Sequence, residues 1–122
     1  MSEHDDQLTV FEYAHGFGGN LDNRLRMLHV IANGAWKGTG KMEAGMKESA
    51  GIPDMMLPVA IPPFHGLYIE LKVKSGRVSA RQRKWIKALR QQGYAAEVCY
   101  GATDAILALD QYLSGGIPPF ED

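Results

Sequence analysis

The stretch from Gly51 to Gln82, GIPDMMLPVAIPPFHGLYIELKVKSGRVSARQ, decides how the rest of the chain is interpreted. Between Leu67 and Val73, apolar residues alternate strictly with Tyr68, Glu70 and Lys72. Side chains of a strand point to opposite faces with period two, so this segment predicts a half-buried strand. Glu70 and Lys72 then share one face, roughly 7 Å apart along the strand.

A second carboxylate, Asp54, opens another apolar run, which continues to Ala60. Pro53 restricts the backbone just before it, and residues 61–66 contain two prolines and a glycine, which is typical of a turn. The two runs therefore predict a hairpin, and a hairpin of this kind brings Asp54 beside Glu70.

Two acids and a lysine in this arrangement suit the hydrolysis of a phosphodiester. Hard divalent cations such as Mg²⁺ take oxygen ligands, usually one or two carboxylates with water and substrate phosphate. The cation polarises the phosphate and lowers the pKa of bound water. Lys72 can orient that water or stabilise the developing negative charge. A solvated pattern of cross-strand charges would have the same spacing, so spacing alone leaves both interpretations open.

The order of these residues resembles a known family. Asp54 followed by Glu70-Leu71-Lys72 is similar to the D…ExK signature of the PD-(D/E)XK nucleases. GIPD, then IELKVKSGRVSARQRKW and later GYAAEVCYG, resemble one branch of them, the VRR-NUC domain, over about half of the chain. The resemblance implies an α/β fold with a restriction-endonuclease-like core, in which helices flank a small mixed sheet. It also implies a single nuclease domain over residues 1–122.

The resemblance implies a role for each residue of the site. Asp54 and Glu70 would bind Mg²⁺ or Mn²⁺, with the backbone carbonyl of Leu71 within reach. Lys72 would position or activate the attacking water. In the family an early helix carries a glutamate with a glutamine four residues later, and Glu3 and Gln7 match that pair better than Glu12 does.

Two of these implied residues also have purely structural explanations. Glu3 would add an acidic group to the metal site, but it equally suits the positive end of the helix dipole. Gln82 matches a family glutamine near the active site, but Ser79 and Gln82 also form a capping box. Gln82 can cap the helix and also lie near the active site.

Charge along the chain is uneven. The net charge of −1 says nothing about nucleic acid, but eight of the 13 Lys and Arg residues lie between residues 71 and 96, where no acid occurs before Glu97. A basic surface beside the site suits a polyanion, although a solvated helix face would look the same. Trp36 lies in a Gly-rich basic loop, where base stacking and core packing are both open. The expected DNA contacts are Lys37, Lys41, Lys74, Arg77, Arg81 and Lys84.

Several classes of protein are excluded. Cys99 is the only cysteine, so there is no intrachain disulfide and no cysteine-rich zinc site, and we expect it to be a small core residue. The four histidines show no metal-ligand spacing. The chain shows no signal peptide and no apolar run long enough for a membrane span. We expect a cytoplasmic protein of a bacterial or phage-infected cell that does not contact a membrane.

Hydrophobic periodicity and turn residues predict the remaining elements. In order, these are a helix over 2–15, a helix-like segment over 21–31 whose end can be extended, a short helix over 42–50, a helix over 80–92, a strand over 94–100 and a last helix from Thr103 or Asp104. The expected core-facing residues are Leu8, Phe11 and Ala14 in the first helix, with Val10 as a further candidate, Trp85, Ile86 and Leu89 in the fourth, and Ile106, Leu107 and 109–113 in the last. Residues 115–122 form a tail, ordered only against a partner.

The most specific function that the resemblance implies is cleavage of branched DNA, including four-way junctions. Paired cuts in a two-fold symmetric junction need two sites, so we expect a homodimer. Alternatives that keep the chemistry are a flap, single-strand or general duplex nuclease. A DNA-binding module with an inactive site is the alternative from another class, and the intact Asp54, Glu70 and Lys72 argue against it.

Overall fold

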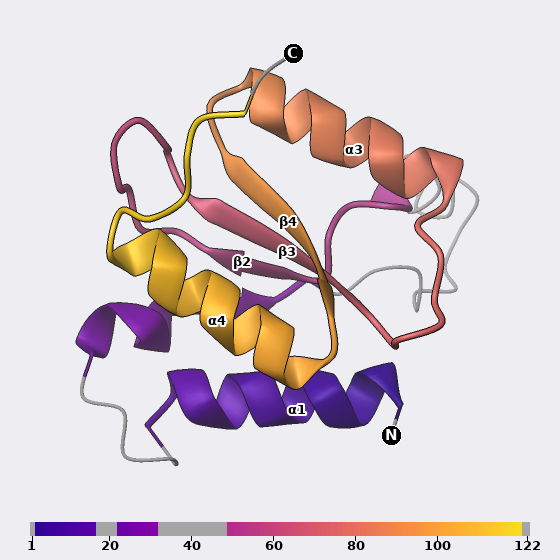
Figure 1. Ribbon diagram of the computed structural model, residues 1–122, viewed down its shortest axis with the longest axis horizontal. Coiled ribbons are helices and arrows are strands. Elements are labelled where there is room, and N and C mark those ends of the chain that lie inside the picture. The colour runs from indigo at the N-terminus through magenta and orange to yellow at the C-terminus, as the bar shows by residue number, and fades with distance from the viewer. Residues whose placement is uncertain (1, 17–21, 32–48, 121–122) are drawn as a thin grey trace, which may run out of the picture.

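The computed structural model of the chain describes residues 2–16, 22–31 and 49–120. They form a mixed four-stranded sheet in the order β1-β2-β3-β4 with helices on both faces (Figure 1). The strands are β1 His29–Val30, β2 Met55–Leu57, β3 Leu67–Lys72 and β4 Ala95–Tyr100; the helices are α1 Glu3–Ala14, the 3₁₀ helix η1 Asn23–Met27, α3 Ala80–Gln91 and α4 Ala102–Leu113. The predicted α/β class is confirmed.

The hairpin predicted from residues 54–73 is present. β2 and β3 pair antiparallel with Met55 opposite Ile69, and the turn between them contains a cis Pro62–Pro63 peptide bond. β3 and β4 pair parallel, and α3 makes the crossover between them. The segment expected to be helix-like over 21–31, with an end that can be extended, is the 3₁₀ helix η1 followed by the short strand β1, which pairs with β2.

The two faces of β3 bury different side chains. Leu67, Ile69 and Leu71 belong to the main core, together with buried residues of α1 and α4. On the other face Tyr68 packs against a smaller cluster built on Ile86 of α3. Because alternate residues of a strand share a face, Glu70 and Lys72 lie on the α3 side of the sheet.

Helix α1 begins as expected but packs differently. The Ser2 hydroxyl accepts a hydrogen bond from the Asp5 backbone N–H, 3.2 Å away, which caps the helix. The buried residues are Asp6, Val10 and Ala14, whereas Leu8 is 52% exposed. The prediction of Leu8 as a core residue was therefore wrong. Acids in the first turn and apolar residues all round the helix leave its sequence without a single apolar stripe.

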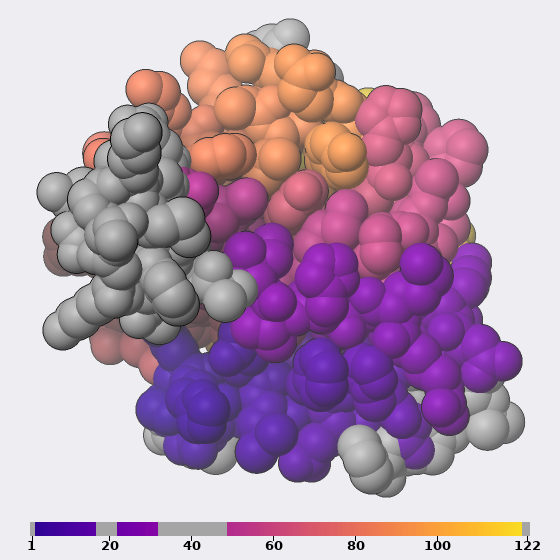
Figure 2. All heavy atoms as spheres, turned by 180° about the vertical axis from the view of Figure 1, so that it is seen from behind, coloured from indigo at the N-terminus to yellow at the C-terminus, as the bar shows by residue number. Residues whose placement is uncertain are grey.

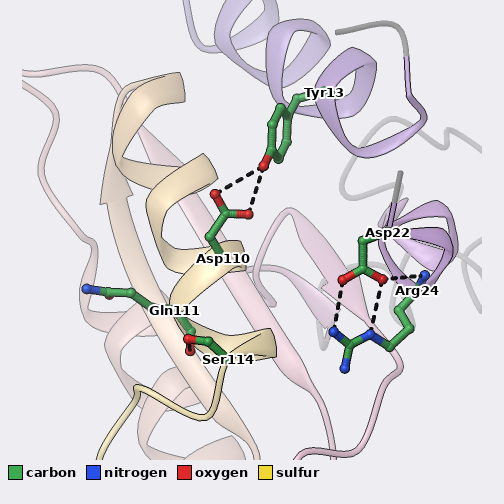
Figure 3. Close-up of polar contacts among 6 residues, drawn as sticks. All are labelled: Tyr13, Asp22, Arg24, Asp110, Gln111 and Ser114. Atoms are coloured by element: carbon green, nitrogen blue, oxygen red, sulfur yellow. Dashed lines mark hydrogen bonds and ion pairs between the residues drawn. The ribbon is translucent and has the colours of Figure 1, made fainter. Parts of the chain in front are cut away.

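A polar contact fixes the angle of α1 against α4. The Tyr13 hydroxyl donates to the Asp110 carboxylate, with oxygen–oxygen distances of 2.8 and 3.0 Å (Figure 3). The same view shows the ion pair between Asp22 and Arg24 at the start of η1. From behind, η1 and β1 form the purple surface between indigo α1 and the pink hairpin (Figure 2). The N-terminal segment thus contacts α4 through Tyr13 and joins the sheet through β1.

Helix α4 packs through its alanines. It begins at Ala102, one or two residues before the predicted start at Thr103 or Asp104, after Gly101 with φ +90°. The Asp104 carboxylate accepts from the Tyr100 backbone N–H at 2.9 Å. Leu107 is 54% exposed and not in the core as predicted, because small alanines on the facing side let α4 approach the sheet closely.

The tail is ordered against its own chain up to residue 120, contrary to expectation. The Phe120 ring lies 5.8 Å from the Phe64 ring, centre to centre. The Arg90 guanidinium lies over the Phe120 ring, 4.0 Å from its centre. Residues 117–120 repeat the sequence IPPF of residues 61–64, and the two segments lie side by side (Figure 1). The short helix expected over 42–50 falls mostly outside the described residues.

Candidate active site

Strand register brings the two predicted acids together. Met55 pairs with Ile69 in the antiparallel hairpin, so the next position places Asp54 opposite Glu70. Asp54 Oδ2 accepts a hydrogen bond of 2.8 Å from the Leu71 backbone N–H. The Asp54 backbone oxygen accepts from Ile31 N at 2.7 Å. Asp54 is therefore held from both sides, and its side chain is directed towards β3.

Glu70 is an unusually placed acid. Its side chain is only 2% exposed. Burial raises the pKa of the Glu70 carboxyl to about 9, and hydrogen bonding and charge repulsion from Asp54 add to this effect. The charge of Lys72 acts in the opposite direction, and that of Glu3 raises the Glu70 pKa slightly further. Without a cation, the Glu70 carboxyl is therefore neutral at pH 7.

Lys72 lies on the same side of β3 as Glu70, two residues along the strand. Its side chain is half-buried, because the loop after β3 folds back over its stem: a Cβ built at Gly76 would lie 3.4 Å from Lys72 Cβ. The ammonium group thus remains within electrostatic reach of Glu70. The structure brings together the D…ExK triad, Asp54, Glu70 and Lys72, that the sequence predicted.

The beginning of α1 forms one wall of a pocket at this place. The pocket has a volume of about 200 Å³ and is lined by Glu3, His4, Gln7, Asp54 and Leu71. Glu3 is exposed, lines this pocket together with Asp54, and acts on Glu70 only through its charge. The sequence motifs did not identify His4 as a residue of the site. Its position next to Glu3 in the first helical turn was the one signal that could have indicated it.

The donor set fits a hard divalent cation. No three His, Cys, Asp or Glu side chains of the described segments group closely enough to hold a metal, so Glu3 does not join Asp54 and Glu70 directly. Two adjoining carboxylates remain, with the Leu71 carbonyl on the same edge of β3 as its N–H. One or two carboxylates with water and phosphate are what Mg²⁺ accepts. A cation there would also relieve the repulsion that keeps Glu70 protonated.

Gln82 forms the predicted capping box at the start of α3. Ser79 Oγ accepts from the Gln82 backbone N–H at 3.1 Å, and Gln82 Oε1 accepts from the Ser79 backbone N–H at 2.9 Å. These two bonds account for the side-chain oxygen of Gln82. Its amide nitrogen takes no part in the cap, so a role near the active site stays a prediction.

The predicted DNA contacts fall into three groups. Lys74 and Arg77 are exposed on the loop between β3 and α3. Arg81 and Lys84 are exposed on α3 and line a pocket of about 280 Å³. Lys37 and Lys41, like Trp36, lie outside the described residues.

Arg81 is next to the segment that carries Asp54. A Cβ built at Gly51, where φ is +95°, would lie 2.8 Å from Arg81 Cγ. Only a residue without a side chain allows this close approach. The basic side of α3 that carries Arg81 therefore borders the GIPD segment.

Comparison with known proteins agrees with this geometry. The family model for the VRR-NUC domain matches residues 26–103, which is more than half of the chain. The chain belongs to the VRR-NUC family. A solved structure described as a VRR_NUC domain protein is similar in fold, with a TM-score of 0.77, 23% identity, and coverage of 93% of this chain and 89% of that chain. A search of curated proteins found no match.

Membership of the VRR-NUC family makes this chain a nuclease-type, DNA-processing domain. The D…ExK residues quoted from the sequence lie within the matched range 26–103. None of the helices that the structure describes is long and apolar enough to cross a membrane.

Proposed function

We propose that this VRR-NUC domain, acting as one unit over residues 1–122, is a Mg²⁺- or Mn²⁺-dependent endonuclease that cleaves branched DNA. The observation that carries the proposal is the buried Glu70 carboxyl pressed against Asp54, with Lys72 on the same face of the strand. A buried acid beside a half-buried one is costly unless a cation binds them. Such a pair is therefore better explained by a metal site than by a solvated charge pattern.

Asp54, Glu70 and the Leu71 carbonyl would hold the metal. When bound, the cation polarises the scissile phosphate and lowers the pKa of a water. The hydrogen bond from Leu71 N orients Asp54 in advance, so that little ordering is left to the moment of binding. Lys72 would direct the attacking water, or stabilise charge that develops on the phosphate.

Residues around the site would bind substrate. Glu3, at the wall of the pocket, would act on the metal through water, and Gln82 would support the water or the phosphate. Four exposed basic side chains would contact the DNA backbone: Lys74, Arg77, Arg81 and Lys84. Lys37 and Lys41, which lie outside the described residues, would add to these contacts.

The most specific form of the proposal is cleavage of four-way junctions by a homodimer. A junction has near two-fold symmetry, and paired cuts need two active sites related in the same way. A flap, a single strand or a plain duplex would need only one site.

The experiment compares cleavage of four-way, flap, single-stranded and duplex DNA at one salt concentration, because binding to DNA depends on salt. We expect cleavage in Mg²⁺ or Mn²⁺, none in EDTA, and preference for the branched substrates. Lys72→Ala should slow cleavage by about 10²- to 10³-fold with little loss of DNA binding.

Lys74→Ala is the matched control, since it removes the same charge two residues further on from an exposed side chain. It should weaken binding and leave the rate at saturating protein nearly unchanged. Cleavage that survives EDTA would overturn the metal role. Tight binding without cleavage in either metal would indicate an inactive DNA-binding module.

A further inference from the structure

Helix α3 presents basic residues on two flanks. With 3.6 residues per turn, Arg81 and Lys84 lie towards one flank, and Arg83, Lys87 and Arg90 lie towards the other. The pockets along the helix divide in the same way: Arg81 and Lys84 line one, and the other three basic residues line another. The first flank borders the GIPD segment, but nothing described so far uses the second.

The second flank forms the wall of a groove at the edge of the sheet. The groove has a volume of about 480 Å³, and we call it the β4-side groove. Its basic residues are Arg83, Lys87 and Arg90, and its apolar lining includes Val78, Val98 and Phe120. In Figure 1 this is where the tail passes the C-terminal end of α3.

Two guanidinium groups of the groove are held in place. Arg90 donates from Nε and Nη2 to the Ala96 carbonyl, at 3.0 and 2.7 Å, and covers the Phe120 ring. Arg83 donates from Nη1 to the Val78 carbonyl at 2.7 Å. A guanidinium has five N–H donors, so both groups keep further donors for an anion. Side chains fixed in advance lose little entropy when they bind.

The same contacts disfavour a peptide strand as the occupant of the groove. β4 is one of the two edge strands of the described sheet. Arg90 occupies its Ala96 carbonyl, and Asp104 occupies its Tyr100 N–H. An edge blocked in this way pairs poorly with another strand. A polyanion needs no strand edge, and three basic side chains complement it in charge.

Among the residues that the structure describes, few acids oppose the basic side chains of the groove. Glu97 interacts with Arg90, but by strand alternation its side chain belongs to the other face of β4, away from Val98. Burial also raises the pKa of the Glu97 carboxyl, which favours its neutral form. Asp104, at the start of α4, is taken up by its bond to Tyr100 N.

We propose that the β4-side groove binds the phosphate backbone of a second DNA arm, while the Arg81 and Lys84 side of α3 binds the arm that is cut. This inference rests on the proposed nuclease function and adds a reason for a preference for branched DNA. Val98 and Phe120 belong to the groove, so its occupant lies against the edge of the sheet. If α3 instead entered the major groove of a single duplex, that duplex would contact the outer surface of the helix and not the β4-side groove.

The test compares two lysines of one helix. Lys84 and Lys87 are both exposed neighbours three residues apart on α3, but they line different pockets, Lys84 the one beside Arg81 and Lys87 the β4-side groove. Binding of four-way and linear duplex DNA is measured with Ca²⁺ in place of Mg²⁺, over a range of salt concentrations. Lys87→Ala should weaken binding of the four-way DNA by roughly fivefold, lower its salt slope by about 1, and leave the linear duplex nearly unaffected. Lys84→Ala should weaken both.

The double variant Arg83→Ala/Lys87→Ala should enlarge the selective loss, and thermal unfolding checks that it is folded. Arg90 is left intact because its bonds hold β4 and the tail. Equal losses on both DNAs, or no loss on either, would overturn the second-arm site while wild-type cleavage still supports the nuclease. A wild-type protein that neither binds nor cuts any DNA would overturn both.

Discussion

At the scale of the residue, Glu70 concentrates the chemistry of this protein. It is a fully enclosed carboxyl beside a second carboxyl, and nothing in the core requires an acid there. Structural acids are usually paired with a cation or kept in water. The electrostatic cost of Glu70 in the metal-free protein is therefore measurable and gives two tests.

The first test is the pH dependence of stability. The Glu70 pKa is about 9 in the folded protein, against an ordinary value of 4.5. Stability that depends on the neutral carboxyl is complete below about pH 4.5 and is lost as the pH rises towards 9. In EDTA we expect the melting temperature to fall over this range. Glu70→Gln should remove most of that slope and stabilise the protein at pH 8 by about 1–3 kcal/mol.

Thermal unfolding of both proteins in EDTA from about pH 5 to about pH 9 measures the difference. Other titrating groups, the histidines included, are common to the two proteins and cancel in the comparison. Parallel slopes for wild type and Glu70→Gln would show that Glu70 is ionised without metal, and would contradict the environment described for it.

The second test is proton release on binding metal. A carboxyl that is neutral at pH 7 must lose its proton to become a ligand, so binding of Mg²⁺ or Mn²⁺ should release close to one proton, and affinity should rise with pH up to about 9. Calorimetry in buffers of different ionisation enthalpy, without DNA, measures this release.

Glu97→Gln provides the control for proton release. Like Glu70, Glu97 is an acid whose pKa is raised by burial, but it is half-buried and lies on β4, outside the proposed metal site. Its substitution should leave proton release unchanged, and Glu70→Gln should abolish it. Metal binding with no proton released by the wild type would argue against Glu70 as a ligand.

At the scale of the element, the parts predicted well are those in which a local pattern and tertiary packing agree. The alternation in residues 67–73 and the turn at 61–66 specify β3 and the hairpin, and with them the approach of Asp54 to Glu70. The capping box at Ser79 and Gln82 marks the start of α3 to the residue. These signals depend on neighbours in sequence, so the sequence alone contains them.

The parts predicted wrongly depend on contacts distant in sequence. Leu8 and Leu107 are apolar but face solvent, because Asp6 and the alanines of α4 fill the inner faces instead. β1 has two residues and no periodicity, so the sequence indicated only that the end of the 21–31 segment can be extended. The burial of Glu70 likewise could not be predicted, since it depends on how parts of the chain remote in sequence pack around β3.

A prediction at this scale separates the cap of α3 from catalysis. Ser79→Ala removes one hydrogen bond of the capping box and should lower the free energy of unfolding by about 1 kcal/mol, with the cleavage rate of the folded protein unchanged. Gln82→Glu keeps the cap, because glutamate also serves at that position. If Gln82 supports water or phosphate as proposed, this variant should keep its stability and cut more slowly.

Denaturant unfolding and single-turnover cleavage of both variants decide between the two roles. A Gln82→Glu protein that is as stable and as active as the wild type would leave capping as the whole role of Gln82. A Ser79→Ala protein that is stable but slow would indicate that the start of α3 itself positions the site.

At the scale of the whole molecule, one chain offers one D…ExK site, placed on the β2–β3 hairpin beside the start of α1. A second cut on a symmetric junction must therefore come from a second chain. Pairing through the edge of β4 is disfavoured by Arg90 and Asp104, so the dimer should form through another surface. The β4-side groove would then stay open on each chain for an arm of the junction.

The homodimer makes a quantitative prediction for a cruciform plasmid, whose extruded four-way junction is resolved to a linear product only when both strands are cut in one encounter. Light scattering should give a mass of about 27 kDa, twice the 13.4 kDa of the chain. Mixing wild type with excess Lys72→Ala chains should produce mixed dimers with one working site, which nick the plasmid. The ratio of nicked to linear product should then rise with the share of Lys72→Ala. A monomeric mass at concentrations that cut, or a ratio that does not change on mixing, would contradict paired cleavage and favour a flap or single-strand substrate, for which one site is enough.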